Sequence, residues 1–190
     1  MPAALFDHIQ KFVSLNAEDL ELLAQYITVK TIAKKEVILN EGQRCDAQYF
    51  IVKGCVRIFT ITENGTEQIT HFGIENWWVS DYLSLEAKSP SHFFIQAVEA
   101  STIVVLNRVL QDELFIKLPQ LERYFRMVAQ KALGASMMRI YYLYLQTAEE
   151  RYRHFANSFP EFIQWIPQYM LASYLGFTPE FLSKVRGKKI

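Results

Sequence analysis

The residues best suited to chemistry lie in the last 25 positions of the chain. Four basic residues and one acidic residue follow Gly176, a local charge of +3 in a chain whose 20 basic and 20 acidic side chains balance. Clustered cations bind phosphates, and carboxylates and ammonium groups hydrogen-bond to base edges. The sequence therefore predicts contact with duplex DNA through Gln168, Tyr169, Thr178, Glu180, Ser183, Lys184, Arg186, Lys188 and Lys189.

Two of these side chains have groups suited to reading bases. A helix that starts at Pro179 presents one face made of Glu180, Ser183, Lys184 and Gly187. Glu180 can accept a hydrogen bond from a cytosine amine, and Lys184 can donate to guanine O6 and N7. We expect Gln168, Tyr169, Arg186, Lys188 and Lys189 to contact phosphates, which position a helix without choosing a base.

The surrounding pattern predicts a helix, a tight turn and a second helix. Gly176 suits the reversal because glycine accepts a positive φ, and Thr178 followed by Pro179 suits the start of the second helix. This is the spacing of a helix-turn-helix. An ordinary helical hairpin with a solvated basic tail is the alternative. The expected shared core consists of Leu171, Leu175, Leu182 and Val185, with the small Ala172 where the helices approach.

The composition indicates a folded protein. The chain has 190 residues, of which 51% are hydrophobic, and this is enough for one large domain or two small ones. It has no signal region and no apolar run of about 20 residues, so a cytoplasmic location is expected. Cys45 and Cys55 fit no disulfide framework or metal motif, and no metal-ligand spacing is found for His8, His71 and His154.

The chain before the terminal segment changes its periodicity twice. The first 27 residues favour helix, with Asn16 as a cap, and the part from about Thr28 to Leu106 favours short strands in a small barrel or sandwich. Asn64-Gly65 predicts a type I′ hairpin turn. Trp77-Trp78 is interpreted as aromatic core packing.

A long helix is predicted from Pro119 to about Gln146. Its apolar residues are spaced by three and four, which suits packing on its own barrel or a seam with a second copy, and we favour the seam. Thr147 is expected to cap a further helix, Ala148 to Ser158. The expected stripe consists of Leu118, Leu121, Phe125, Val128, Ala132 and Ala135, and it is widened by Ala129, Leu133, Ile140 and Leu143.

Together these segments resemble the Crp/Fnr family of bacterial transcription regulators, in a subgroup common in Bacteroidota. The resemblance rests on the glycines at 42, 54 and 65, the long helix, and Ala172-Ser173-Tyr174-Leu175-Gly176. It implies an α+β chain: a cyclic-nucleotide-binding-type β-roll (residues 1–118), a dimerisation helix (119–146) and a helix-turn-helix domain (147–190) whose wing is truncated or absent. The implied partners are double-stranded DNA, a second copy of the chain and RNA polymerase, with no membrane.

The resemblance also implies a ligand pocket, at positions where this chain departs from the family. Where nucleotide-binding members have Gly-Glu, Arg-Ser and Thr-Ser pairs, this chain has Ser80-Asp81, Ser91-His92 and Ser136-Met137. Ser91 cannot replace a guanidinium at a phosphate. We expect no usual response to cyclic AMP and no certain cofactor, and the pocket is either vestigial or holds another small molecule.

Three functions are compatible with these residues. The favoured one is a dimeric transcription regulator. A second is a module for cyclic nucleotides or other small molecules whose terminal helices contact proteins. An enzyme on the β-roll is the weakest because the sequence has no acid–base or metal constellation for it, so no catalytic residue is predicted.

Overall fold

The computed structural model describes residues 3–187, which form two compact units. The first comprises the chain up to Thr60 together with Thr70–Val128, and the second comprises Ile61–Ile69 together with the chain from Ala129 onward. The division inside the long helix differs from the three consecutive segments proposed from the sequence. Of the helices within residues 3–187, none is both long enough and apolar enough to cross a membrane.

The chain begins with two short helices, α1 (Ala3–Gln10) and α2 (Ala17–Gln25). Asn16 caps α2 as expected. Its side chain accepts a hydrogen bond from the Asp19 amide, and the Asp19 carboxylate accepts one from the Asn16 amide. This reciprocal pair satisfies two amides that a helix leaves without partners at its start.

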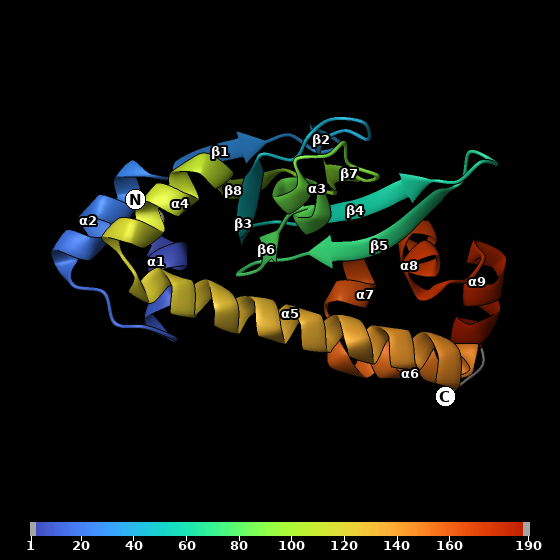
Figure 1. The fold of residues 1–190 in the computed structure, drawn as a ribbon. Helices are drawn as coiled ribbons and strands as arrows, with labels where there is room; N and C mark the ends of the chain where they lie inside the picture. Colours follow the sequence, from blue (N-terminus) through green and yellow to red (C-terminus); the bar gives the residue numbers. More distant parts are fainter. Residues whose placement is uncertain (1–2, 188–190) are drawn as a thin grey trace. The chain divides into compact units, whose positions relative to one another are not determined.

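Two four-stranded sheets form the β-roll (Figure 1). One has the order β1-β8-β3-β6 and the other β2-β7-β4-β5. The pairs β1–β8, β3–β8, β3–β6, β2–β7 and β4–β7 are antiparallel. The strands are β1 (Thr28–Ile32), β2 (Val37–Leu39), β3 (Ala47–Lys53), β4 (Val56–Ile61), β5 (Glu67–Gly73), β6 (Trp78–Val79), β7 (Phe94–Ala97) and β8 (Ser101–Asn107).

The β-roll core is built from side chains that alternate along the strands. Ile51 in β3, Ile95 in β7 and Ile103 in β8 are fully buried in one cluster. Cys45 belongs to the same cluster, and Cys55 is also buried, so both cysteines are free and act as small core residues as expected. Among the described residues, no group of three or more histidine, cysteine or acidic side chains is placed to hold a metal ion.

The β4–β5 hairpin differs from the predicted turn. A type I′ turn needs a positive φ at both central residues, but only Gly65 has one (φ 76°), and Asn64 does not. The Gly65 amide donates to the Thr62 carbonyl at 2.8 Å, and the Thr62 amide donates to the Thr66 carbonyl at 2.9 Å. The loop is therefore the three-residue type that ends in a left-handed glycine, and the type I′ prediction is wrong.

Helix α3 (Tyr82–Ala87) follows β6, and α4 (Arg108–Lys117) follows β8. Helix α4 ends at its C-cap residue, Leu118, and the chain continues as α5 (Gln120–Leu145), whose bounds are close to those of the predicted helix. The first turns of α5 bury Leu121 and Tyr124 in a second core, together with α1, α2 and α4. Phe125 and Val128 pack against that core, so the first half of the predicted seam faces its own unit.

An aromatic cluster holds the start of α5. The Tyr124 hydroxyl accepts from Trp78 Nε1 at 2.8 Å and pairs with His8 Nδ1 at 2.7 Å. Trp78 packs on Phe50 and Phe125, as the core interpretation requires. Trp77 is exposed, so the core interpretation is wrong for this residue.

Four helices follow α5 in the described part of the second unit, which ends at residue 187. Helix α6 (Ala148–Ser158) starts at the Thr147 cap and has the predicted bounds. Helix α7 (Phe162–Trp165) is a single turn that the sequence did not predict. Helices α8 (Gln168–Leu175) and α9 (Pro179–Gly187) form the expected helix-turn-helix. The α+β architecture, with a β-roll, a long helix and C-terminal helices, is confirmed.

Candidate functional site

The turn between α8 and α9 has the geometry that the sequence indicated. Gly176 is left-handed (φ 78°), and its amide donates back to the Ala172 and Ser173 carbonyls. Thr178 caps α9 because its hydroxyl oxygen accepts from the Phe181 amide at 3.2 Å. The four predicted core residues, Leu171, Leu175, Leu182 and Val185, are all buried. The apolar face of α9 is thereby fixed inward.

The opposite face of α9 is available to a partner. Glu180, Ser183, Lys184, Arg186 and Gly187 are all exposed. Hydrogen bonds from its own backbone amide and from the Thr178 hydroxyl hold the pKa of the Glu180 carboxyl below its usual range. Glu180 is therefore ionised at neutral pH and can act only as an acceptor. Gln168 and Tyr169 are exposed at the start of α8, and Lys188 and Lys189 lie outside the described residues.

The end of α8 is held by the start of β5, in the same unit. The Ser173 hydroxyl accepts from the Ile69 amide at 2.8 Å and donates to the Glu67 carbonyl at 2.9 Å. The Gln68 side-chain amide donates to the Ser173 carbonyl. We call this set of contacts the Ser173 clasp. It fixes α8 to the first three residues of β5, directly after the β4–β5 turn.

Arg139 of α5 binds the same end of α8. Its Nη2 donates to the Tyr174 carbonyl at 2.9 Å, and its guanidinium lies 4.5 Å from the centre of the Tyr174 ring. A cation at a helix C-terminus interacts favourably with the unpaired carbonyls there. The second half of α5 therefore positions the helix-turn-helix through a charged hydrogen bond.

The predicted pocket residues of the β-roll bond to one another. Ser91 Oγ donates to Asp81 Oδ2 at 2.7 Å, while Asp81 Oδ1 accepts from the Leu83 and Ser84 amides at the start of α3. Asp81 is 6% exposed and Ser91 is 2% exposed. Both carboxylate oxygens of Asp81 are thus engaged inside the protein, so this carboxylate is not free to accept from a hydroxyl group of a ligand.

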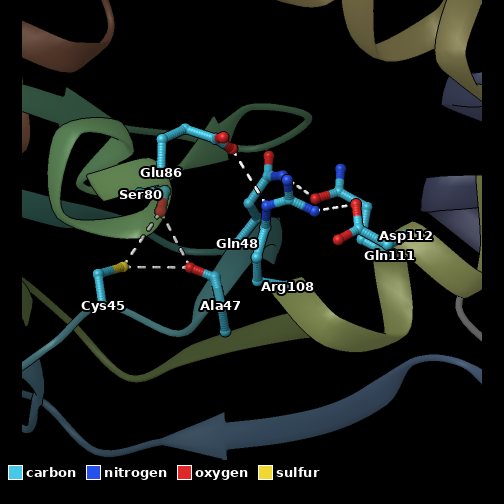
Figure 2. Close-up of polar contacts among 8 residues, drawn as sticks. All are labelled: Cys45, Ala47, Gln48, Ser80, Glu86, Arg108, Gln111 and Asp112. Atoms are coloured by element: carbon cyan, nitrogen blue, oxygen red, sulfur yellow. Dashed lines mark hydrogen bonds and ion pairs between the residues drawn. The ribbon is translucent and has the colours of Figure 1, made fainter. Parts of the chain in front are cut away.

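Ser80 is engaged in the same way (Figure 2). Its hydroxyl donates to the Ala47 carbonyl at 2.9 Å and lies 3.2 Å from the Cys45 sulfur. His92 is exposed and lies next to the buried Ser91 in the chain. Ser136 and Met137 are on α5 in the second unit, where Met137 is 63% exposed. The structure therefore brings Ser80, Asp81 and Ser91 together in one buried region.

Side-chain bonds also fix α4 beside this region (Figure 2). Arg108 forms ion pairs with Glu86 of α3 and with Asp112 one turn further along α4. The buried Gln48 of β3 donates to Gln111 of α4 at 2.8 Å. These contacts hold α3, which carries the Asp81 cap, to β3 and α4.

The comparisons with known proteins agree with this architecture. Residues 29–116 match the model of the cyclic nucleotide-binding domain. The chain is 30% identical to electron transport regulator A of Shewanella oneidensis, over 92% of this chain and 74% of the relative. The chain belongs to the Crp/Fnr family of transcription regulators.

Two further family members show how far the similarity extends. The fumarate and nitrate reduction regulatory protein of Vibrio cholerae is 28% identical, over 92% of this chain and 74% of its own length. The structure of a putative Crp/Fnr regulator from Eubacterium rectale superposes with a TM-score of 0.68 over 90% of this chain and 82% of that one, at 14% identity. The Crp/Fnr fold thus extends across both units.

Sequence reasoning missed three residues near the helix-turn-helix. Ser173 and Arg139 act through the clasp and the Tyr174 carbonyl, and partners this distant along the chain leave no local spacing to detect. Phe181 lies on α9 and is exposed. The signal for Phe181 was present in the helical spacing, because it lies three residues before Lys184 on a helix whose buried positions are Leu182 and Val185.

Proposed function

We propose that this Crp/Fnr protein is a dimeric regulator that binds duplex DNA by placing α9 in the major groove. The observation that carries the proposal is the exposed face of α9, where an ionised Glu180 and Lys184 lie one turn apart beside a capped helix start. Helix-turn-helix proteins contact base edges with the first residues of the second helix. Such a protein acts in the cytoplasm, and RNA polymerase is its expected further partner.

Exposed apolar residues in the second half of α5 support the dimer. Leu133, Met137, Ile140, Tyr141 and Tyr144 are all exposed, and their spacing of four, three, one and three residues places them along one side of the helix. A stripe of this kind is stabilised when a second copy covers it. The proposed seam therefore keeps the C-terminal part of the stripe expected from the sequence, which includes Leu133 and Ile140, while the first residues of that stripe are packed in the core.

The β-roll is proposed to have a sensor role that does not use cyclic AMP in the usual way. Binding of the phosphate would need a cation where Ser91 lies, and the Ser91 hydroxyl is already bonded to Asp81. A ligand in this region would have to break that buried bond or bind elsewhere. The effector of this member is therefore proposed to be a different small molecule, or the pocket has lost its ligand.

A selection from randomised DNA duplexes tests the proposed function. The purified protein is expected to enrich a two-fold symmetric motif whose half-sites lie about one helical turn apart, because a symmetric dimer presents both α9 helices to one side of the duplex. Lys184→Ala is expected to relax the preference at one base pair of each half-site, at a cost of about 1–3 kcal/mol there. Arg186→Ala is the matched control, and it should weaken all duplexes evenly and reduce the salt dependence.

The same experiment can refute the proposal. The assignment of base reading to α9 would be refuted if the selection enriched no symmetric motif and if the Lys184→Ala variant had the same base preference as the wild type. Absence of any salt-dependent duplex binding would favour the other function, a small-molecule module whose terminal helices contact proteins.

A further inference from the structure

Phe181 is a large apolar side chain on the part of α9 that faces solvent. It is 42% exposed, whereas its neighbour Leu182 and the next inward residue, Val185, are buried. Phe181 is the third residue of α9. It lies three residues before Lys184, so these two side chains are neighbours on the helix surface, and Lys184 is in turn the neighbour of Glu180 one turn earlier.

Neighbouring side chains and the helix cap hold the exposed Phe181 ring in place. Phe177 meets it in an edge-to-face arrangement with the ring centres 5.5 Å apart. The Arg151 guanidinium of α6 lies 4.9 Å from the centre of the Phe177 ring. The Phe181 amide donates to the Thr178 cap, which fixes the backbone of the same turn. A side chain held in this way loses little conformational freedom when a partner covers it.

The chemistry of the ring limits what it can recognise. Phenylalanine neither donates nor accepts a hydrogen bond, so it cannot read the polar pattern of a base pair. In the major groove the thymine 5-methyl group is the apolar feature that distinguishes a base, and phenylalanine is one of the side chains that contact it. A ring next to the Lys184 ammonium group on the exposed side of α9 would add an apolar contact to the polar contacts of Glu180 and Lys184.

We propose that Phe181 reads one thymine in each half-site through the 5-methyl group. The proposal rests on the proposed function, since it requires α9 to enter the major groove. It adds a specificity-determining residue to the two polar readers, Glu180 and Lys184, and it requires a thymine within the contacts of the first turn of α9. Phe181 is expected to contribute to base preference and to leave the salt dependence of binding unchanged.

Deoxyuridine substitution tests this proposal because it removes only the methyl group. Each thymine in the duplex enriched by selection is replaced in turn, and the affinity of the wild-type protein is measured at constant salt. Replacement of the contacted thymine in one half-site is expected to weaken binding about fourfold, the effect of withdrawing one methyl group from an apolar contact. Replacement in both half-sites is expected to give about sixteenfold.

Variants assign the effect to Phe181. Phe181→Ala is expected to bind the thymine and deoxyuridine duplexes equally, and Phe181→Leu is expected to retain part of the difference. Trp165→Ala is the matched control, because Trp165 is an aromatic residue of α7 with a similar exposure of 44%, and it should keep the full wild-type difference. Thermal unfolding of each variant shows whether it is folded.

The outcomes separate this proposal from the proposed function. A symmetric motif in which no thymine responds to deoxyuridine would overturn the role of Phe181 and leave DNA binding intact. A deoxyuridine effect that is equal in wild type and Phe181→Ala would also overturn it. Failure of the wild type to enrich any motif would overturn the proposed function and this role with it. The deoxyuridine scan uses only the wild type, so the proposal can be refuted even if a variant does not fold.

Discussion

Ser91→Ala is expected to destabilise the β-roll, although the substitution removes a single oxygen atom. The Ser91 hydroxyl donates to the Asp81 carboxylate at 2.7 Å, and both residues are almost completely buried. A hydrogen bond to a charged group contributes about 1.5–3 kcal/mol, and a buried acceptor left without its donor retains the cost of its lost hydration. The Phe93 amide, which donates to Ser91 Oγ at 3.0 Å, loses its acceptor as well. We expect a loss of about 3 kcal/mol in the free energy of unfolding.

Chemical denaturation of the purified protein measures this loss. In thermal unfolding, the same loss of about 3 kcal/mol lowers Tm by roughly 10 °C for a unit of this size. Ser89→Ala is the matched control, since Ser89 is exposed two residues away, and it should change stability by less than about 0.5 kcal/mol. Equal stabilities of Ser91→Ala and the wild type would refute the view that the Asp81–Ser91 bond organises this region.

The same samples test the ligand proposal. A ligand present at 100 times its Kd stabilises a protein by about 2.7 kcal/mol, which is a readily measured rise in Tm. Cyclic AMP is expected to give no such rise in the wild type, because Ser91 has no charge for the phosphate and is bonded to Asp81. A rise in Tm at micromolar cyclic AMP would contradict the proposal that the β-roll does not bind cyclic AMP in the usual way.

Two further predictions concern the second unit. Met137→Glu combined with Tyr141→Glu is expected to yield a monomer in sedimentation, since a buried unpaired charge costs several kcal/mol, and an unchanged dimer mass would place the seam elsewhere. Thr147→Ala removes the cap of α6 and should lower the free energy of unfolding by about 1 kcal/mol in urea titrations at neutral pH. Hydrogen bonds from the Thr147 amide and hydroxyl lower the pKa of Glu150, so the stabilisation from this carboxylate is complete above the ordinary carboxyl pKa and is lost as pH falls through the lowered value. The difference between wild type and Thr147→Ala should therefore narrow in acid, and a difference that widens would contradict this assignment.

Features set by a few neighbouring residues could be predicted from the sequence. The caps at Asn16 and Thr147 each depend on a partner three residues away, and both form as expected. The helix-turn-helix depends on Gly176, Thr178 and their apolar neighbours, all within 15 residues. The elements that the sequence missed include β6, which has two residues, and α7, which has four, because so short a run carries no periodicity.

Features that depend on distant partners could not be predicted. Spacing indicated an apolar stripe on the long helix but could not divide it between the core of the first unit, which receives Leu121, and the surface, which has Leu133. The bond between Asp81 and Ser91 joins residues ten positions apart, and only the path of the chain through α3 brings them together. The Asn64-Gly65 pair correctly indicated a hairpin, but the bond from the Thr62 amide to Thr66 lengthened the turn by one residue.

The Ser173 clasp has a consequence for solubility. Strand β5 is an edge strand of its sheet. An edge strand offers unpaired amides and carbonyls with which a strand of another chain can form hydrogen bonds. The Ser173 hydroxyl occupies the Ile69 amide and the Glu67 carbonyl, two groups on one strand that a neighbouring strand would also use. A single side chain of α8 thus blocks strand addition at this end of β5. The first helix of the DNA-binding motif thereby also guards the protein against edge-to-edge aggregation.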